Sequence, residues 1–136
     1  MAPLSGGCGC GAVRFEITEP LGAAVYCHCT RCQRRTGTAA SANARLAPGS
    51  LVIVAGADRV ATWQPPDGWA KLFCADCGSA LFSRDCEDPS VMSVRLGTVD
   101  GDPGVRPDAR QFVAYAAAWE PIPDDGLPRW PEGRDD

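Results

Sequence analysis

The spacing of the cysteines constrains this sequence more than any other feature. Cys27, Cys29 and Cys32 place three thiols within six residues. A Cys-x-Cys-x-x-Cys run can bend tightly enough for its three sulfurs to meet one tetrahedral zinc ion. Three protein ligands leave the fourth position open, as in zinc sites that bind a substrate. We therefore predict that this run is the centre of the chemistry.

Two further pairs of cysteines suit a second metal site. Cys8 and Cys10 lie among glycines, and Cys74 and Cys77 precede Gly78. Four thiolates form a closed tetrahedral zinc site, which is structural and coupled to folding. There are two alternatives to a single four-cysteine site. The two cysteine pairs could be unrelated to each other, or they could form a redox couple. A thioredoxin-like couple needs a helix that begins at the motif, whereas the residues after Cys77 predict a turn and a strand.

Length and composition indicate one small domain. The 136 residues are 45% apolar, enough to bury one core, so we predict a single zinc-binding β domain over 4–130 and a frayed tail over 131–136. The net charge of −4 and the pI near 4.9 argue against a nucleic-acid partner.

The expected location follows from two absences in the sequence. No apolar run approaches ~20 residues, and the first residues lack the basic and apolar segments of an export signal. We therefore expect a soluble, cytoplasmic protein without a membrane partner. In a reducing compartment its eight cysteines are reduced and bind metal rather than form disulfides.

Short runs of alternating apolar and polar residues, separated by glycine and proline turns, predict an all-β fold. No helical periodicity extends beyond two turns, and the strand spacing of about ten residues favours a sandwich or sheet bundle of short antiparallel strands stapled by zinc. The expected strands are residues 13–17, 24–26, 51–54, 60–63, 69–73, 81–83, 91–96 and 112–115. Residues 60–63 and 69–73 should form a hairpin.

The charge of the three-cysteine site favours sulfur chemistry. Three thiolates on Zn²⁺ leave a net charge near −1, which makes the ion a weak activator of water but a good template for an exogenous thiolate. The guanidinium groups of Arg34 and Arg35 could stabilise the surplus charge or bind an anionic substrate. The alternative is that both lie on a solvated turn.

Several other side chains have two interpretations. His28 could be a ligand, but flanking residues of an extended Cys-x-Cys point away from the metal, which favours a packing or hydrogen-bonding role. Cys86 has acidic neighbours, which raise a thiol pKa and favour an inert cysteine. Trp63, Trp69 and Tyr26 could line a cleft or belong to the core.

Four blocks of the sequence resemble the glutathione-dependent formaldehyde-activating enzyme family, which includes the domain of centromere protein V. The matching blocks span nearly the whole chain and hold seven cysteines in the same order. They are Gly7-Cys8-x-Cys10-Gly11, Cys27-His28-Cys29-x-x-Cys32-Gln33-Arg34 with Thr36-Gly37, Phe73-Cys74-x-x-Cys77-Gly78, and Trp119 with Leu127-Pro128-Arg129-Trp130.

The resemblance implies a tent-like all-β fold with a structural zinc and a second, labile zinc. The structural ligands would be Cys8, Cys10, Cys74 and Cys77, and the second-site ligands Cys27, Cys29 and Cys32. The family's activity joins formaldehyde to glutathione as S-hydroxymethylglutathione, formally a carbon–sulfur lyase reaction in reverse. Members often carry a histidine where this chain has Arg110. If that position lines the cleft, substrate choice would differ.

The sequence is therefore compatible with three functions. The first is a zinc-dependent carbon–sulfur lyase, with catalytic residues Cys27, Cys29, Cys32 and Arg34, that binds a glutathione-like thiol and a small aldehyde such as formaldehyde. The second is a non-catalytic zinc scaffold that binds a protein or small ligand. The third is a sulfur reductase that uses Cys86, for which the sequence shows no recycling partner.

Overall fold

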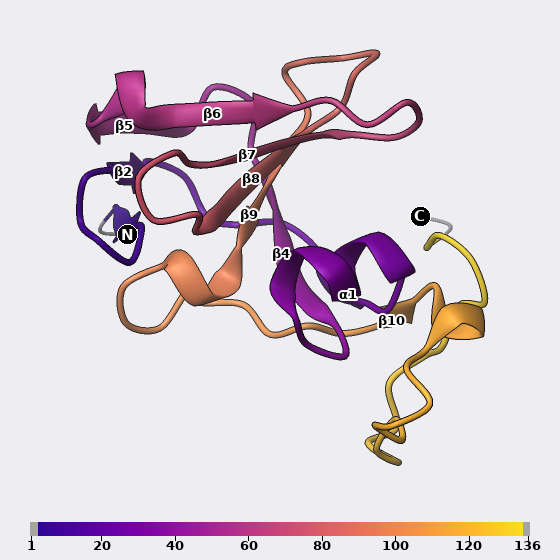
Figure 1. Cartoon of the computed structure of the whole chain (residues 1–136). Helices are drawn as coiled ribbons and strands as arrows, with labels where there is room; N and C mark the ends of the chain where they lie inside the picture. The colour runs from indigo at the N-terminus through magenta and orange to yellow at the C-terminus, as the bar shows by residue number, and fades with distance from the viewer. Residues whose placement is uncertain (1–2, 135–136) are drawn as a thin grey trace.

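The computed structural model describes residues 3–134, which form two β-sheets and one short α-helix (Figure 1). The smaller sheet has the order β1-β2-β5, from β1 (Leu4–Gly7), β2 (Arg14–Ile17) and β5 (Leu51–Ala55). The larger has the order β10-β3-β4-β9-β8-β7-β6. Its strands are β3 (Ala24–Cys27), β4 (Ser41–Leu46), β6 (Val60–Trp63), β7 (Ala70–Cys74), β8 (Ala80–Arg84), β9 (Met92–Arg95) and β10 (Arg110–Gln111).

The predicted all-β class is confirmed. The strand pairs are antiparallel except β10 and β3, which run parallel and place Gln111 opposite Cys27. The predicted hairpin is β6 with β7. The α-helix is α1 (Thr30–Thr36), and three 3-10 turns follow as η1 (Ala57–Arg59), η2 (Leu96–Thr98) and η3 (Val113–Tyr115). No helix within residues 3–134 has the length and apolar character to cross a membrane.

The core lies between the two sheets. Phe15 and Ile17 of β2 are buried and Glu16 between them is exposed, as the period-2 alternation predicts. The ring of Phe15 meets the ring of Phe82 from β8 edge-on, with centroids 5.0 Å apart. This contact joins the small sheet to the large one, and edge-to-face geometry is a favoured arrangement for aromatic pairs.

One predicted strand is absent from the structure, and three observed strands were not predicted. Residues 112–115 are not a strand: Phe112 has a left-handed backbone with φ of 55°, and η3 follows it. The strands β1, β4 and β10 were not predicted, because β1 contains two glycines, β4 begins in a small-residue segment and β10 has only two residues. A Cβ on Gly6 would overlap the Phe15 ring and the Thr98 carbonyl, so the glycine lets the edge strand pack closely against the core.

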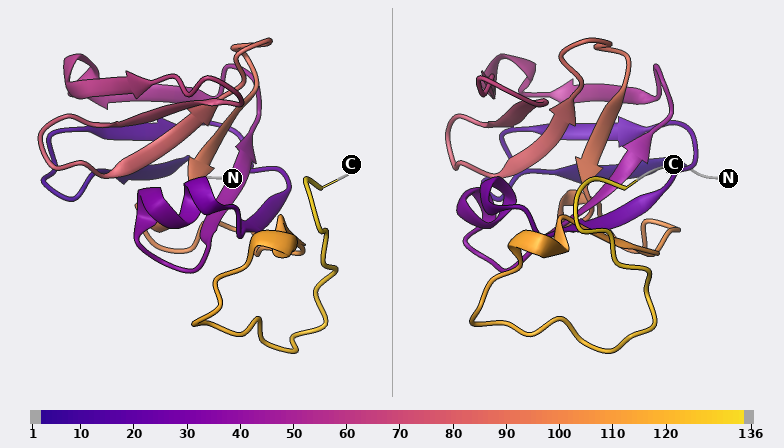
Figure 2. Two further views of the ribbon diagram at one scale, coloured as in Figure 1. Left: turned by 45° about the vertical axis from the view of Figure 1, so that its right-hand side comes forward. Right: turned by 90° about the vertical axis from the view of Figure 1, so that its right-hand side faces the viewer.

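The C-terminal segment leaves the body and returns to it. Residues 116–127 form a projecting loop (Figure 2). The chain then runs beside β10, where the Trp130 N–H donates to the Arg110 carbonyl at 2.8 Å. Contacts with the body continue beyond the predicted boundary at 130, because Phe112 donates to the Glu132 carbonyl and the Arg134 side chain to Asp108. Residues 135–136 lie outside the described part of the chain.

Candidate functional site

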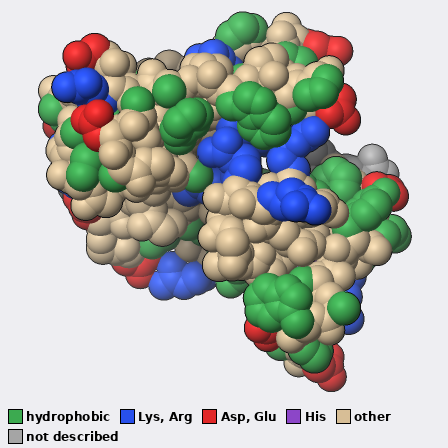
Figure 3. All heavy atoms as spheres, in the orientation of Figure 1, with side chains coloured by type: hydrophobic (Ala, Val, Ile, Leu, Met, Phe, Trp, Pro, Cys, Tyr) green, Lys and Arg blue, Asp and Glu red, His purple; other side chains and the backbone are tan. Residues whose placement is uncertain are grey.

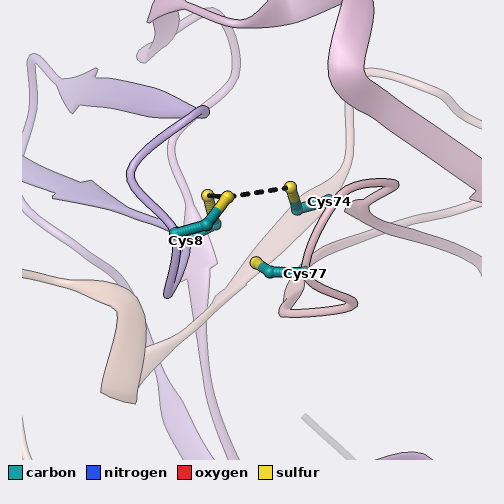
Figure 4. A group of neighbouring side chains, drawn as sticks. Cys8, Cys74 and Cys77 are labelled. Carbon is teal, nitrogen blue, oxygen red and sulfur yellow. Dashed lines mark hydrogen bonds between the residues drawn. The ribbon is translucent and has the colours of Figure 1, made fainter.

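Four cysteines that are distant in sequence meet where the two sheets face each other. Cys8 and Cys10 lie in the turn between β1 and β2, and Cys74 and Cys77 lie at the turn between β7 and β8. Their sulfurs all lie within 4.8 Å of one another, a separation at which they could hold one metal ion. Figure 4 shows the labelled sulfurs of Cys8, Cys74 and Cys77 pointing toward a common space.

The backbone of both turns holds these thiols in place. The Val13 N–H donates to the Cys8 sulfur at 3.2 Å, and Gly78 adopts a φ of 78° that suits glycine. The Ser79 hydroxyl lies 3.2 Å from the Cys77 sulfur, and this hydrogen bond is the main cause that lowers the pKa of Cys77 to about 5. Because one turn belongs to each sheet, an ion bound here would tie the two sheets together.

The second group of thiols forms where β3 leads into α1. Cys27 ends β3, Cys29 is the N-cap of α1 and Cys32 lies in its first turn. Their sulfurs also lie within 4.8 Å of one another. Cys27 and Cys32 are buried and Cys29 is partly exposed. The helix ends at Gly37, whose left-handed backbone is a common C-cap.

Within this group the pKa of Cys32 is lowered, whereas those of Cys27 and Cys29 are raised. Hydrogen bonds with the Cys27 and Cys29 thiols lower the pKa of Cys32, although burial opposes this effect. The Ser41 hydroxyl and the positive charge of Arg95 lower it further. The pKa of Cys27 is raised, because its hydrogen bonds to Cys29 and Cys32 and its burial favour the neutral thiol.

The second group opens onto a cavity of about 630 Å³. Figure 3 shows Lys and Arg side chains gathered around a hollow between α1 and the connection that links β6 to β7. Its walls come from all strands of the larger sheet except β6, from the turn between β6 and β7, from α1 and from the C-terminal segment. The lining residues are Ala23, Val25, Cys27, Cys29, Arg31, Cys32, Asn43, Ala44, Arg45, Gly68, Trp69, Lys71, Ser83, Ser93, Arg95, Gln111, Phe112 and Arg134.

Apart from the three thiols, the ionisable side chains of the cavity wall are all basic. Five described lining residues are Lys or Arg, and none is Asp or Glu. Arg31 is held by Asp67 at 2.7 Å and Arg134 by Asp108 at 2.5 Å, and Arg45 stacks on the Trp69 ring. The cavity is therefore suited to an anionic ligand, despite the net charge of −4 on the whole chain.

Of the two arginines predicted to act near the thiols, only Arg35 lies on the side of α1 that faces them. Arg34 is exposed and is not among the described residues that line the cavity. Arg35 is partly buried over the Phe73 ring, and its charge acts on Cys32. Arg31 is the arginine of α1 that lines the cavity.

His28 points away from the cysteine group that flanks it. Its Nε2 lies 3.1 Å from the Arg110 guanidinium, which donates to Asp125 at 2.8 Å and stacks on the Tyr26 ring. Burial, followed by the positive charge of Arg110, lowers the pKa of His28 and keeps the ring neutral. Arg110 is buried and does not line the cavity, so the expected effect of this position on substrate choice would have to be indirect.

Of the other residues considered from the sequence, one lines the cavity and two lie at the surface. Trp69 lines the cavity, whereas Trp63 is exposed beneath the Arg31 guanidinium. Cys86 is exposed and belongs to neither cysteine group. Lys71 and Arg95 line the cavity but were not predicted as site residues. The only signal in the sequence was that each is a basic residue within a predicted strand.

Two cysteine groups, each able to hold a metal ion, on a two-sheet β domain define a metal-site protein with a basic cavity beside the three-thiol group. The family comparison agrees with this class. The model of the family described as glutathione-dependent formaldehyde-activating enzyme matches residues 3–115, and the chain belongs to this family.

Individual relatives support the same assignment. A Halomonas elongata protein, provisionally named a glutathione-dependent formaldehyde-activating enzyme, is 30% identical over 105 residues, which cover 73% of this chain and 67% of the relative. A crystal structure of a Rhodobacter sphaeroides protein aligns with a TM-score of 0.61 and 25% identity, over 93% of this chain and 98% of that one. Its fold is therefore similar to the one described above.

Proposed function

We propose that this protein is a zinc-dependent enzyme of carbon–sulfur bond chemistry, which adds a glutathione-like thiol to a small aldehyde such as formaldehyde or releases it. The observation that carries the proposal is the position of the three-thiol group at the wall of a positively charged cavity. Family membership supplies the thiol and aldehyde as substrate classes. We also infer a cytoplasmic location, because free thiols persist in a reducing compartment.

Zinc fits both donor sets, since soft thiolates in a tetrahedral arrangement are its preferred ligands. The group of Cys8, Cys10, Cys74 and Cys77 supplies all four ligands and would be structural. The group of Cys27, Cys29 and Cys32 supplies three and leaves one position for a ligand from the cavity. When bound there, the ion would lower the pKa of an incoming thiol and fix its sulfur.

The residues of the chain then have separate tasks. The three cysteines hold the ion, and the basic wall binds the acidic groups of the thiol substrate and orients it. In the reaction a sulfur–carbon bond forms, the carbon–oxygen double bond becomes single, and the thiol proton is transferred through water to the oxygen. The product is a hydroxymethyl thioether, and the reverse steps return thiol and aldehyde.

Arg34 was predicted to assist in catalysis, but it is exposed on α1 and does not line the cavity. Arg31 lies on the same helix and does line the cavity, so it is the matched comparison. If Arg34 attracts the anionic thiol from the helix surface, Arg34→Ala should raise KM for glutathione at low ionic strength, and added salt should remove the difference. Arg31→Ala should raise KM at both ionic strengths, because Arg31 lines the cavity. Equal KM for wild type and Arg34→Ala would remove Arg34 from the site.

Exchange NMR can test the function directly. The rate of interconversion between glutathione with formaldehyde and S-hydroxymethylglutathione should rise when protein carrying two zinc ions per chain is added, and not when Cys29→Ser is added. No increase with fully loaded wild-type protein would reject the enzyme. The non-catalytic scaffold would then be the better account of the same zinc sites.

A further inference from the structure

One buried arginine in the cavity forms no ion pair with a carboxylate of the described chain, although its charge acts on the Cys32 sulfur. Arg95 lies on β9 opposite Asn43 of β4, and its side chain lines the cavity although the residue is only 8% exposed. One guanidinium nitrogen donates to the Asn43 side-chain oxygen at 2.8 Å. No carboxylate within residues 3–134 forms an ion pair with it. Buried charged groups are normally paired and hydrogen-bonded, and an anionic group of a ligand would supply the hydrogen-bonded partner that the described carboxylates do not.

Neighbouring charges increase the imbalance. Lys71 also lines the cavity without an ion pair among the described residues, and burial lowers its pKa while the Cys32 charge opposes that shift. Arg35 on α1 is close enough to Arg95 for their like charges to interact. Three thiolates on one divalent ion would carry a single negative charge, which could not balance the three positive charges of Arg35, Lys71 and Arg95. Two positive charges therefore remain for a ligand to neutralise.

The chemistry of a guanidinium decides which anion suits this position. Its planar fork matches a carboxylate with two parallel hydrogen bonds, whereas an ammonium acts as a point charge. Asn43 fixes the fork through one nitrogen, so the other N–H groups are available for a ligand. The two strands that carry these residues are paired, which holds the fork rigidly relative to the thiol group.

We propose that Arg95, oriented by Asn43 and assisted by Lys71, is the specificity-determining residue of the cavity and binds a carboxylate that lies away from the sulfur of the thiol ligand. The inference rests on the proposed function because it concerns the same thiol-binding cavity. The carboxylate site adds a requirement to the thiol substrate. Neutral thiols of similar size should bind poorly, and a thiol with two carboxylates should be favoured.

Binding can be measured without catalysis or a sulfur–metal bond. The probe is S-methylglutathione, in which methylation blocks the thiol, and its dimethyl ester lacks both carboxylates. Calorimetry should show wild-type protein binding the acid at least about tenfold more tightly than the ester, with the difference reduced by added salt. Arg95→Gln should weaken binding of the acid roughly 10- to 100-fold, as expected for loss of hydrogen bonds to a charged group.

Matched variants separate recognition from folding. Arg95→Lys should restore only part of the affinity and Asn43→Ala should weaken it several-fold, since the first loses the fork and the second its orientation. Arg106→Gln removes a positive charge from an exposed pair with Asp102 and should leave binding unchanged. Metal content and circular dichroism are measured on every variant. The acid-against-ester comparison needs only wild-type protein, so it does not depend on any variant folding.

Two results would overturn the inference: equal affinity of wild type for the acid and the ester, or unchanged binding of the acid by folded Arg95→Gln. The outcome is separable from that of the proposed function. Arg95-dependent binding without any glutathione–formaldehyde exchange would reject the enzyme and keep the carboxylate site. Catalysis that accepts glutathione dimethyl ester, whose thiol is free, as well as it accepts glutathione would keep the enzyme and reject the site.

Discussion

The sulfur of Cys29 accepts a hydrogen bond from the backbone N–H of Cys32 at 3.3 Å, so one side chain both caps helix α1 and faces the three-thiol group. An N-cap satisfies a backbone donor that the helix cannot satisfy itself. The formation of the helix and the geometry of the candidate metal site are therefore set by the same residue. This link allows the two roles to be tested separately.

Serine and alanine at position 29 should have different effects. Cys29→Ser keeps a preferred capping group but loses a soft ligand, so the variant should bind one metal ion per chain with a nearly unchanged stability of the remaining fold. Cys29→Ala loses both and should be about 1 kcal/mol less stable than Cys29→Ser. Metal analysis and urea unfolding measure the two effects. Two metal ions in Cys29→Ser would contradict the assignment of this thiol as a ligand.

Removal of a cysteine from the four-thiol group should be far more damaging. Cys77→Ser breaks a site that joins turns from both sheets, and structural zinc sites contribute roughly 10 kcal/mol or more to folding. We expect insoluble protein or loss of the cooperative thermal transition. Cys86→Ser is the control, because Cys86 is exposed and outside both groups. A soluble Cys77→Ser with the wild-type midpoint would rule out a structural ion there.

Mild chelation should distinguish the two sites by their lability. The four-thiol group can release an ion only if the turns of two sheets separate, whereas the three-thiol group lies within one short segment. One zinc should leave while one stays, the β-sheet circular dichroism should be retained, and any thiol–aldehyde activity should disappear and return with added zinc. Simultaneous loss of both ions and the fold would count against a separate labile site.

The close packing of β1 predicts the effect of a single methyl group. In Gly6→Ala the new Cβ would overlap the Phe15 ring and the backbone carbonyl of Thr98, which cannot move cheaply. We expect a loss of about 1–3 kcal/mol in the free energy of unfolding. Gly97→Ala is the matched control, since its Cβ would have no neighbour within 4 Å. Equal stability of the two variants would show that the small sheet shifts to accommodate the methyl group.

The sequence by itself determined which thiols form the two cysteine groups, and it determined most strands. Thiols at i, i+2 and i+5 converge because the chain between them is short, so Cys27, Cys29 and Cys32 meet in any compact conformation of that segment. Alternation likewise identified β2 and the β6–β7 hairpin, because a half-buried strand repeats every two residues. The glycine-rich β1 carries no such pattern and could not be predicted from it.

Only the tertiary structure decided which charges reach the cavity. Arg34 is closer in sequence to the cysteines than Arg95, yet the rotation of α1 exposes Arg34 while the pairing of β4 with β9 places Arg95 beside Asn43 in the cavity wall. Ligand spacing and hydrophobic period act over a few residues and are visible in the sequence. Convergence of Lys71 and Arg95 depends on strand order and register, which are set by burial of the whole core.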